Sequence, residues 1–142
     1  MAQGWTSYAN ARYGATADVP PGFVPEGPEA HNSDGLRFRA NGGAAYMTIY
    51  GADVPGKAFE AKIKDMMAFD QSYSGWRITG STITNSWAEY SGSIGSGQLR
   101  VRVEASCNGA QLVAARFEYA GNLKSAISRV FASLEAGPAN SC

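Results

Sequence analysis

The stretch that decides the fold covers residues 8–51 and reads YANARYGATADVPPGFVPEGPEAHNSDGLRFRANGGAAYMTIYG. Short apolar and β-branched runs alternate with Pro, Gly, Asn and Asp, the residues that form turns. The pattern predicts a first strand through Tyr13 and Val19 that ends near Phe23, a turn over residues 32–35 and a hairpin over residues 36–51. None of it has the spacing of a catalytic motif, so the stretch predicts architecture rather than chemistry.

Two segments further along the chain have helical periodicity. Residues 56–70 place apolar side chains on one stripe, and Asp53 and Pro55 mark the expected start of that helix. Residues 122–134 do the same, with Asn122 as the expected capping residue. Between the helices, alternating apolar and polar residues predict extended segments over 76–84, 86–94, 99–105 and 113–119.

The last two of these strands are joined by an Asn-Gly turn and predict a hairpin. Arg100 and Arg102 alternate with apolar residues in one strand, as Arg116 and Glu118 do in the other. We expect these charged residues to share the polar face of the hairpin, where opposite charges can pair.

The predicted element order is β-β-β-α-β-β-β-β-α. Runs of strands with isolated helices indicate an α+β fold, here a mostly antiparallel sheet of six to seven strands covered by two helices. The chain has 142 residues, which is the usual size of one domain, so we expect a single domain over residues 1–142.

Composition excludes some classes of partner. The chain has 12 Lys and Arg and 12 Asp and Glu, so its formal net charge is zero. A nucleic-acid-binding surface needs an excess of positive charge to neutralise phosphates, so we expect no nucleic-acid partner. No apolar run approaches the roughly 20 residues that cross a bilayer, so we expect no transmembrane segment.

Three parts of the chain together resemble one known family. Tyr-Ala-Asn-Ala-Arg-Tyr-Gly at 8–14, Asp-Val-Pro-Pro-Gly-Phe at 18–23 and the last helix at 127–134 are similar to the PsbP-like α/β/α sandwich family, in particular to its small secreted members in Gram-negative bacteria. The resemblance covers nearly the whole chain. It implies a non-enzymatic protein-binding or assembly module; relatives include photosystem accessory subunits and periplasmic immunity proteins that plug a toxin's active site. The family shares no catalytic set, so no catalytic residue or cofactor is implied.

The two cysteines bear on the compartment. Cys107 lies beside a turn, Cys142 is the last residue, and their spacing matches neither a metal site nor a Cys-x-x-Cys redox motif. We expect a disulfide between them, and the alternative is a pair of free thiols in a cytosolic protein. The polar start Met-Ala-Gln-Gly-Trp resembles an added Met on a processed end. Together these features predict a periplasmic or secreted protein.

The chain's single histidine, His31, lies in a polar loop with Glu26, Glu29 and Asp34. These four residues could form a weak metal site, and a small enzyme or a ligand or metal carrier built on this loop is the alternative function. The loop lacks both the calcium-binding rhythm of an EF-hand and a second His for zinc. We therefore favour an ordinary polar loop with Asp34 in its turn.

The aromatic residues give the remaining functional signal. Tyr and Trp beside Arg are the residue types that anchor protein interfaces. The candidate docking face for a protein partner consists of Trp87, Tyr90, Arg100, Arg102 and Arg116. The alternative is that these aromatics close the core under the helices. The predicted function is thus a non-enzymatic binding module, with an immunity or inhibitor-type role as its most specific form.

Titration of the denatured, unreduced protein with a thiol reagent tests the predicted disulfide. We expect no titratable thiol, and we expect reduction to lower the free energy of unfolding by about 2 to 4 kcal/mol because the unfolded chain gains freedom. Two titratable thiols would reject the bridge between Cys107 and Cys142.

Overall fold

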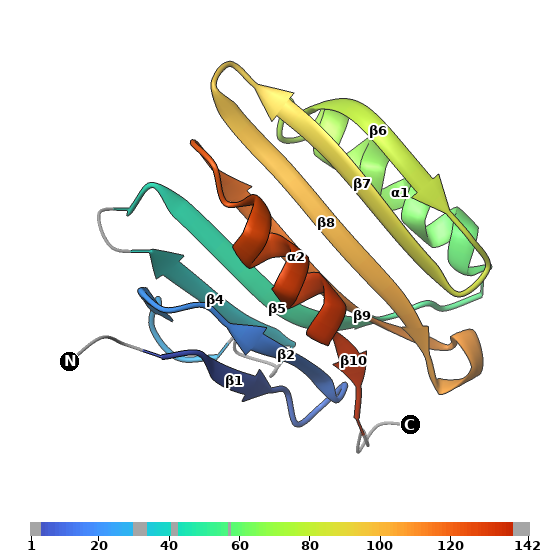
Figure 1. Ribbon diagram of the computed structural model, residues 1–142. Coiled ribbons are helices and arrows are strands. Elements are labelled where there is room, and N and C mark those ends of the chain that lie inside the picture. Colours follow the sequence, from blue (N-terminus) through green and yellow to red (C-terminus); the bar gives the residue numbers. More distant parts are fainter. Residues whose placement is uncertain (1–3, 30–33, 41–42, 57, 138–142) are drawn as a thin grey trace.

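The computed structural model describes residues 4–29, 34–40, 43–56 and 58–137, and these form two sheets and two α-helices (Figure 1). The larger sheet has seven antiparallel strands in the order β3-β4-β5-β9-β8-β7-β6. Its strands are β3 (Phe23–Pro25), β4 (Gly35–Ala40), β5 (Ala45–Asp53), β6 (Arg77–Ile83), β7 (Trp87–Ile94), β8 (Gly97–Ser106) and β9 (Gln111–Tyr119). The predicted α+β class, with a mostly antiparallel sheet and two helices, is confirmed.

The start of the chain differs from the prediction because it forms a second, three-stranded sheet. This sheet contains β1 (Thr6–Ala9), β2 (Ala15–Val19) and β10 (Glu135–Ala136), with β2 in the centre. Asn10 creates the break between β1 and β2, because its buried Oδ1 accepts a hydrogen bond from the backbone N–H of Tyr13 at 2.7 Å. The expected first strand through Tyr13 and Val19 thus corresponds to β2, while β1 precedes it and Phe23 begins a separate strand, β3, of the large sheet.

The helices are α1 (Phe59–Ser72) and α2 (Lys124–Ser133). The predicted start of α1 is wrong: Asp53 still belongs to β5, and Gly56 has a φ of +66°, which no α-helical residue adopts. For α2 the N-cap is Leu123 rather than the expected Asn122, although Asn122 Oδ1 accepts a hydrogen bond from the backbone N–H of Lys124 at 3.1 Å. Neither helix has the length and apolar character needed to cross a membrane.

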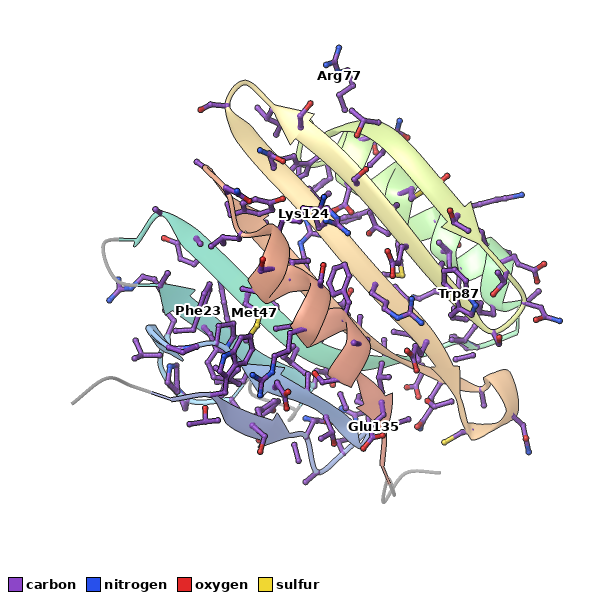
Figure 2. All side chains as sticks on the ribbon, viewed as in Figure 1. Phe23, Met47, Arg77, Trp87, Lys124 and Glu135 are labelled. Carbon is purple, nitrogen blue, oxygen red and sulfur yellow. The ribbon has the colours of Figure 1, made fainter. Side chains whose placement is uncertain are left out.

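The two helices lie on opposite faces of the large sheet, and each covers about half of its face (Figure 1). Helix α1 packs on β6, β7 and β8, with Ile63 against a core that includes Val101. Helix α2 and the small sheet pack on β4, β5 and β9, in a second core that includes Met47 and Phe117. Figure 2 shows Phe23 and Met47 among the side chains of this second core.

Because a helix covers each face of the large sheet, the prediction for the β8–β9 hairpin is wrong. In the observed register Arg100 lies opposite Phe117, and Val101 lies opposite Arg116. Residues directly opposite each other in an antiparallel pair share a face, so Arg100 and Arg116 lie on opposite faces of the sheet. The expected shared polar face does not exist because each face of these strands faces its own core.

Gly51 in β5 offers a test of the contact between the N-terminal segment and the large sheet. A Cβ at this position would lie 2.2 Å from Cβ and 2.4 Å from Cγ of Tyr13. We expect Gly51→Ala to lower the free energy of unfolding by about 1–3 kcal/mol through overpacking, measured by urea denaturation. Gly80→Ala is the matched control, because a Cβ there meets only Ser91 Oγ at 3.5 Å. Equal stability of the two variants would contradict the close packing of Tyr13 on Gly51.

Candidate functional site

The five residues of the predicted docking face lie on two different surfaces. Trp87, Arg100 and Arg102 lie on the half-face of the sheet that α2 leaves uncovered. Tyr90 and Arg116 lie on the α1 side, where Tyr90 belongs to the core under α1. The single docking face is therefore wrong, and the core alternative holds for Tyr90.

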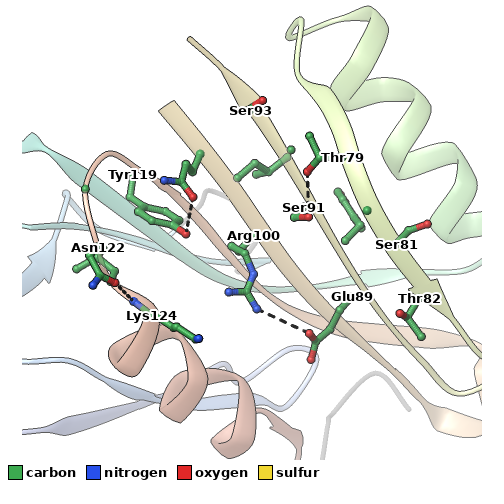
Figure 3. Close-up of a pocket in the computed structure, with 17 residues that line it drawn as sticks. Thr79, Ser81, Thr82, Glu89, Ser91, Ser93, Arg100, Tyr119, Asn122 and Lys124 are labelled. Carbon is green, nitrogen blue, oxygen red and sulfur yellow. Dashed lines mark hydrogen bonds and ion pairs between the residues drawn. The ribbon is translucent and has the colours of Figure 1, made fainter. Parts of the chain in front are cut away.

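The surface beside α2 is a polar groove, which we call the α2 groove (Figure 3). It has a volume of about 750 Å³, a floor formed by β6, β7 and β8, and a wall formed by the segment that leads into α2. Its lining is rich in hydroxyl and amide groups, and Thr79 Oγ1 lies 3.2 Å from Ser91 Oγ. At the α2 end, the Tyr119 hydroxyl donates to Gln98 Oε1 at 3.3 Å.

The charged residues beside this groove are paired with one another. Arg102 contacts Glu89 at 2.7 Å and Glu104 at 3.1 Å, and its guanidinium lies 4.8 Å from the centre of the Trp87 ring. Arg100 lies 3.9 Å from Glu89. Two carboxylates thus hold Arg102 in place, and its guanidinium covers part of the Trp87 ring.

On the other side of the sheet, a cavity of about 430 Å³ opens between α1 and strands β5 and β9; we call it the α1 pocket. Aromatic and thioether side chains form much of its lining, from Tyr50, Met66, Phe69 and Tyr90. Its polar lining residues are Lys62, Asp65, Asp70, Ser74 and Arg116.

A buried network of hydrogen bonds forms the floor of the α1 pocket. Asp70, 3% exposed, accepts a hydrogen bond from the Tyr90 hydroxyl at 2.7 Å. Arg116 binds the same carboxylate with two nitrogens, at 3.0 Å to Oδ1 and 3.1 Å to Oδ2, and donates from Nε to Glu118 at 2.8 Å. Such two-point contacts fix both position and orientation, so the floor of the pocket is rigid.

Burial sets the protonation of this network. It raises the pKa of Tyr90, and it raises the pKa of Tyr50 to about 12, because the tyrosinate form loses its hydration. Burial alone would lower the pKa of Arg116, but the hydrogen bonds to Asp70 and Glu118 outweigh it and raise that pKa. At neutral pH both tyrosines therefore keep their protons, and Tyr90 acts as a hydrogen-bond donor.

Two exposed aromatic residues, Phe69 on α1 and Tyr73 at its C-cap, lie at and beside the rim of the α1 pocket. Phe69 is 56% exposed and Tyr73 is 79% exposed, and their rings stack with centroids 4.8 Å apart at 27°. Phe69 also lines the pocket. This pair does not belong to the predicted docking face, although Phe69 and Tyr73 are four residues apart and lie off the buried stripe, a spacing that places both rings on one side of the helix end.

The acidic residues of the predicted metal loop do not converge. Glu26 lies 3.6 Å from Arg37, Glu29 accepts a hydrogen bond from the Tyr8 hydroxyl, and Asp34 binds Arg12 at 2.9 Å. Within the described residues, no group of three His, Cys, Asp or Glu side chains is placed to hold a metal ion.

Two predicted residues lie beyond the part of the chain that the structure describes. His31 is one of them, so its role in the loop stays a prediction. Cys142 is the other, and the disulfide with Cys107 likewise stays a prediction.

Replacement of Tyr90 tests the buried network. A hydrogen bond to a charged acceptor contributes about 1.5–3 kcal/mol, so Tyr90→Phe should lower the free energy of unfolding at neutral pH by that amount. The folded protein keeps the Tyr90 proton where the unfolded chain loses it, so wild-type stability should fall as pH rises above about 10. Tyr90→Phe should lessen this fall by about 1.4 kcal/mol at about pH 11.

Chemical denaturation at neutral and alkaline pH measures both effects. Tyr73→Phe is the control, because its ring is exposed and it should change neither value. If wild type and Tyr90→Phe lose the same stability at alkaline pH, the Tyr90 hydroxyl is not a buried hydrogen-bond donor.

Comparison with known proteins gives a structural likeness and no sequence match. No protein-family model and no curated protein matches the chain. The Ran-binding protein Mog1p of Saccharomyces cerevisiae superposes with a TM-score of 0.61 at 8% identity, over 96% of each chain. A mutant of Mog1 gives a TM-score of 0.59 at 9% identity, over 92% of this chain and 96% of that one. At such identities the likeness shows the fold alone: the chain has the Mog1p/PsbP-like fold.

Proposed function

We propose that the protein is a non-enzymatic binding module that docks another protein at the α1 pocket. The observation that carries the proposal is the stacked, exposed pair of Phe69 and Tyr73 beside a cavity with a rigid floor. Exposed apolar side chains that adjoin one another and a pocket mark interaction sites, whereas singly scattered ones are ordinary.

The α1 pocket has the composition of an interface centre. Tyr, Phe, Met and Arg are enriched there, and energetically dominant residues cluster around well-packed pockets. Phe69 and Met66 can contact an incoming side chain, and the pairing of Arg116 with Asp70 means that docking uncovers no unpaired charge. The α2 groove lacks this character, because hydroxyl groups and mutually paired charges line it.

The size and charge of the α1 pocket indicate which kind of partner side chain would fit it. A volume of about 430 Å³ holds one or two apolar side chains, such as Leu, Met or Phe. Lys62 and Asp65 line the pocket with opposite charges, so no single sign of charge is favoured there. The partner therefore presents an apolar anchor surrounded by polar groups, which is the usual arrangement of a non-obligate interface.

The comparisons support the class of function and leave the partner open. Mog1p, which has this fold, is described as a Ran-binding protein, so one protein of this fold binds another protein. The resemblance to periplasmic immunity proteins supports a periplasmic or secreted site of action, with an inhibitor-type role as the specific form of binding. The alternative, a small enzyme or a ligand or metal carrier at the predicted metal loop, has weaker support, because Glu26, Glu29 and Asp34 each have a separate partner.

Affinity capture from a periplasmic extract tests the proposal, with wild type and Phe69→Ala/Tyr73→Ala as baits. We expect the wild type to retain a specific protein and the double variant to bind it at least about 30-fold more weakly, since loss of a central aromatic costs about 2 kcal/mol or more. Quantitative mass spectrometry, followed by titration of the purified partner, gives the ratio.

Ile94→Ala is the matched control, because Ile94 is also an exposed apolar residue, at 46%, but lies at the end of β7. Circular dichroism checks that each bait is folded. Equal capture by wild type and the double variant would overturn the assignment of the docking surface to α1.

A further inference from the structure

The large sheet ends in two edge strands of very different character. Within the described residues these are β3 at one side and β6 at the other. Strand β3 has three residues and contains Pro25, which has no N–H to donate. Strand β6 has seven residues and lies at the outer side of the sheet, away from the small sheet (Figure 1). An edge strand presents unpaired backbone groups, so β6 is the open edge of this protein.

Strand β6 has few of the features that protect an edge from pairing. Natural edges carry charged residues, Pro or bulges. In β6 only Arg77, its first residue, is charged, and the strand contains no Pro. A β-bulge lies between Ile78 and Gly80, but the pairing with β7 is regular again from Gly80 to Ile83. The second half of β6 is therefore a regular and uncharged edge.

We propose that β6 pairs antiparallel with β6 of a second copy of this chain. The side chains of β6 set the chemistry of the strand that fits beside it. Ile78 and Ile83 pack against the core under α1, while Thr79 and Thr82 line the α2 groove on the other face. An added strand continues both faces if it is largely uncharged and combines aliphatic residues on the α1 side with small and hydroxyl residues elsewhere. Strand β6 itself has this composition, with Ile78 and Ile83 near its two ends and Thr, Gly and Ser between them.

Charge and symmetry also favour a second copy. In an antiparallel pair the two Arg77 side chains lie at opposite ends, about 20 Å apart at 3.4 Å per residue. This exceeds the screening length of about 8 Å at physiological ionic strength, so the two charges do not oppose pairing. The formal net charge of the chain is zero, so two copies do not repel each other overall.

The same geometry limits association to two copies. Antiparallel pairing of β6 with itself is a two-fold contact that uses both open edges. The joined sheet would then end in β3 on each side, a strand too short and too rich in Pro to add another. The product is a closed dimer rather than a fibre. Its contact lies on the β6 side of α1, while the α1 pocket lies on the β5 and β9 side, so the two surfaces are separate.

Sedimentation velocity of the full chain, from about 1 µM to about 1 mM, tests the dimer over the usual range of weak self-association. We expect a concentration-dependent species of twice the monomer mass. Thr82→Lys, at an exposed position of β6, should weaken the dimer at least about tenfold, because Lys is a natural protection of edge strands. Val24→Lys adds the same charge at the other edge, where Val24 is 42% exposed, and should leave the dimer unchanged.

Hydrogen exchange gives a second readout that does not depend on the variants. We expect the amides of β6 to exchange more slowly as the wild-type concentration rises, and those of β3 to stay unchanged. A monomer at every concentration, a dimer that tolerates Thr82→Lys, or a dimer without protection of β6 would each overturn the proposal. None of these outcomes bears on partner capture by the α1 pocket, so the two proposals fail or stand separately.

Discussion

Burial of the central strands on both faces is the constraint on which the rest of this structure depends. Residues 112–115 of β9 are four consecutive residues with no exposed surface, and they point alternately into the two cores. A sheet buried in this way needs a cover on each side. The described chain supplies one helix for each face, aided by the small sheet on the α2 side, so each face is only partly covered. The α2 groove and the α1 pocket lie where the covers end.

Helix α1 is held on the sheet by an apolar stripe and by one buried carboxylate. Phe59, Ile63 and Asp70 are its buried residues, and Asp70 lies close to its C-terminal end. The carboxylate of Asp70 thus replaces an apolar contact with directed bonds to Tyr90 and Arg116. Buried polar networks of this kind fix geometry more than they add stability. The consequence for function is that the rotation of α1 is fixed, which keeps Phe69 and the C-cap residue Tyr73 on the exposed side.

Periodicity predicted the elements well because each depends on local spacing. The stripe around Ile63 and the alternation around Val101 identified α1 and β8, whereas the break at Asn10 depends on a side-chain hydrogen bond that alternation does not reveal. The face of each strand was harder to predict. Val113, Ala115 and Phe117 resemble the single buried face of a half-exposed strand, but the unbroken apolar run over 112–115 is typical of burial on both sides. That error placed Arg100 and Arg116 together. Of the residues that line the α1 pocket, the sequence predicted Arg116 and Tyr90 as site residues but not Phe69. Periodicity identifies the buried face of a helix, and Phe69 lies on the other side of α1.

The pairing of β2 with β10 brings together two strands that are far apart in the sequence. Ala15 lies opposite Ala136, and the N–H of Gly137 donates to the carbonyl of Gly14 at 2.8 Å. Because most of the described chain separates these residues, closing this contact costs more loop entropy than closing the hairpins of the large sheet. During synthesis, β2 can gain β10 as its second neighbour only after the residues between them have emerged. The core under α2, which includes Ala15 and Leu134, therefore cannot close before the residues near Leu134 are available.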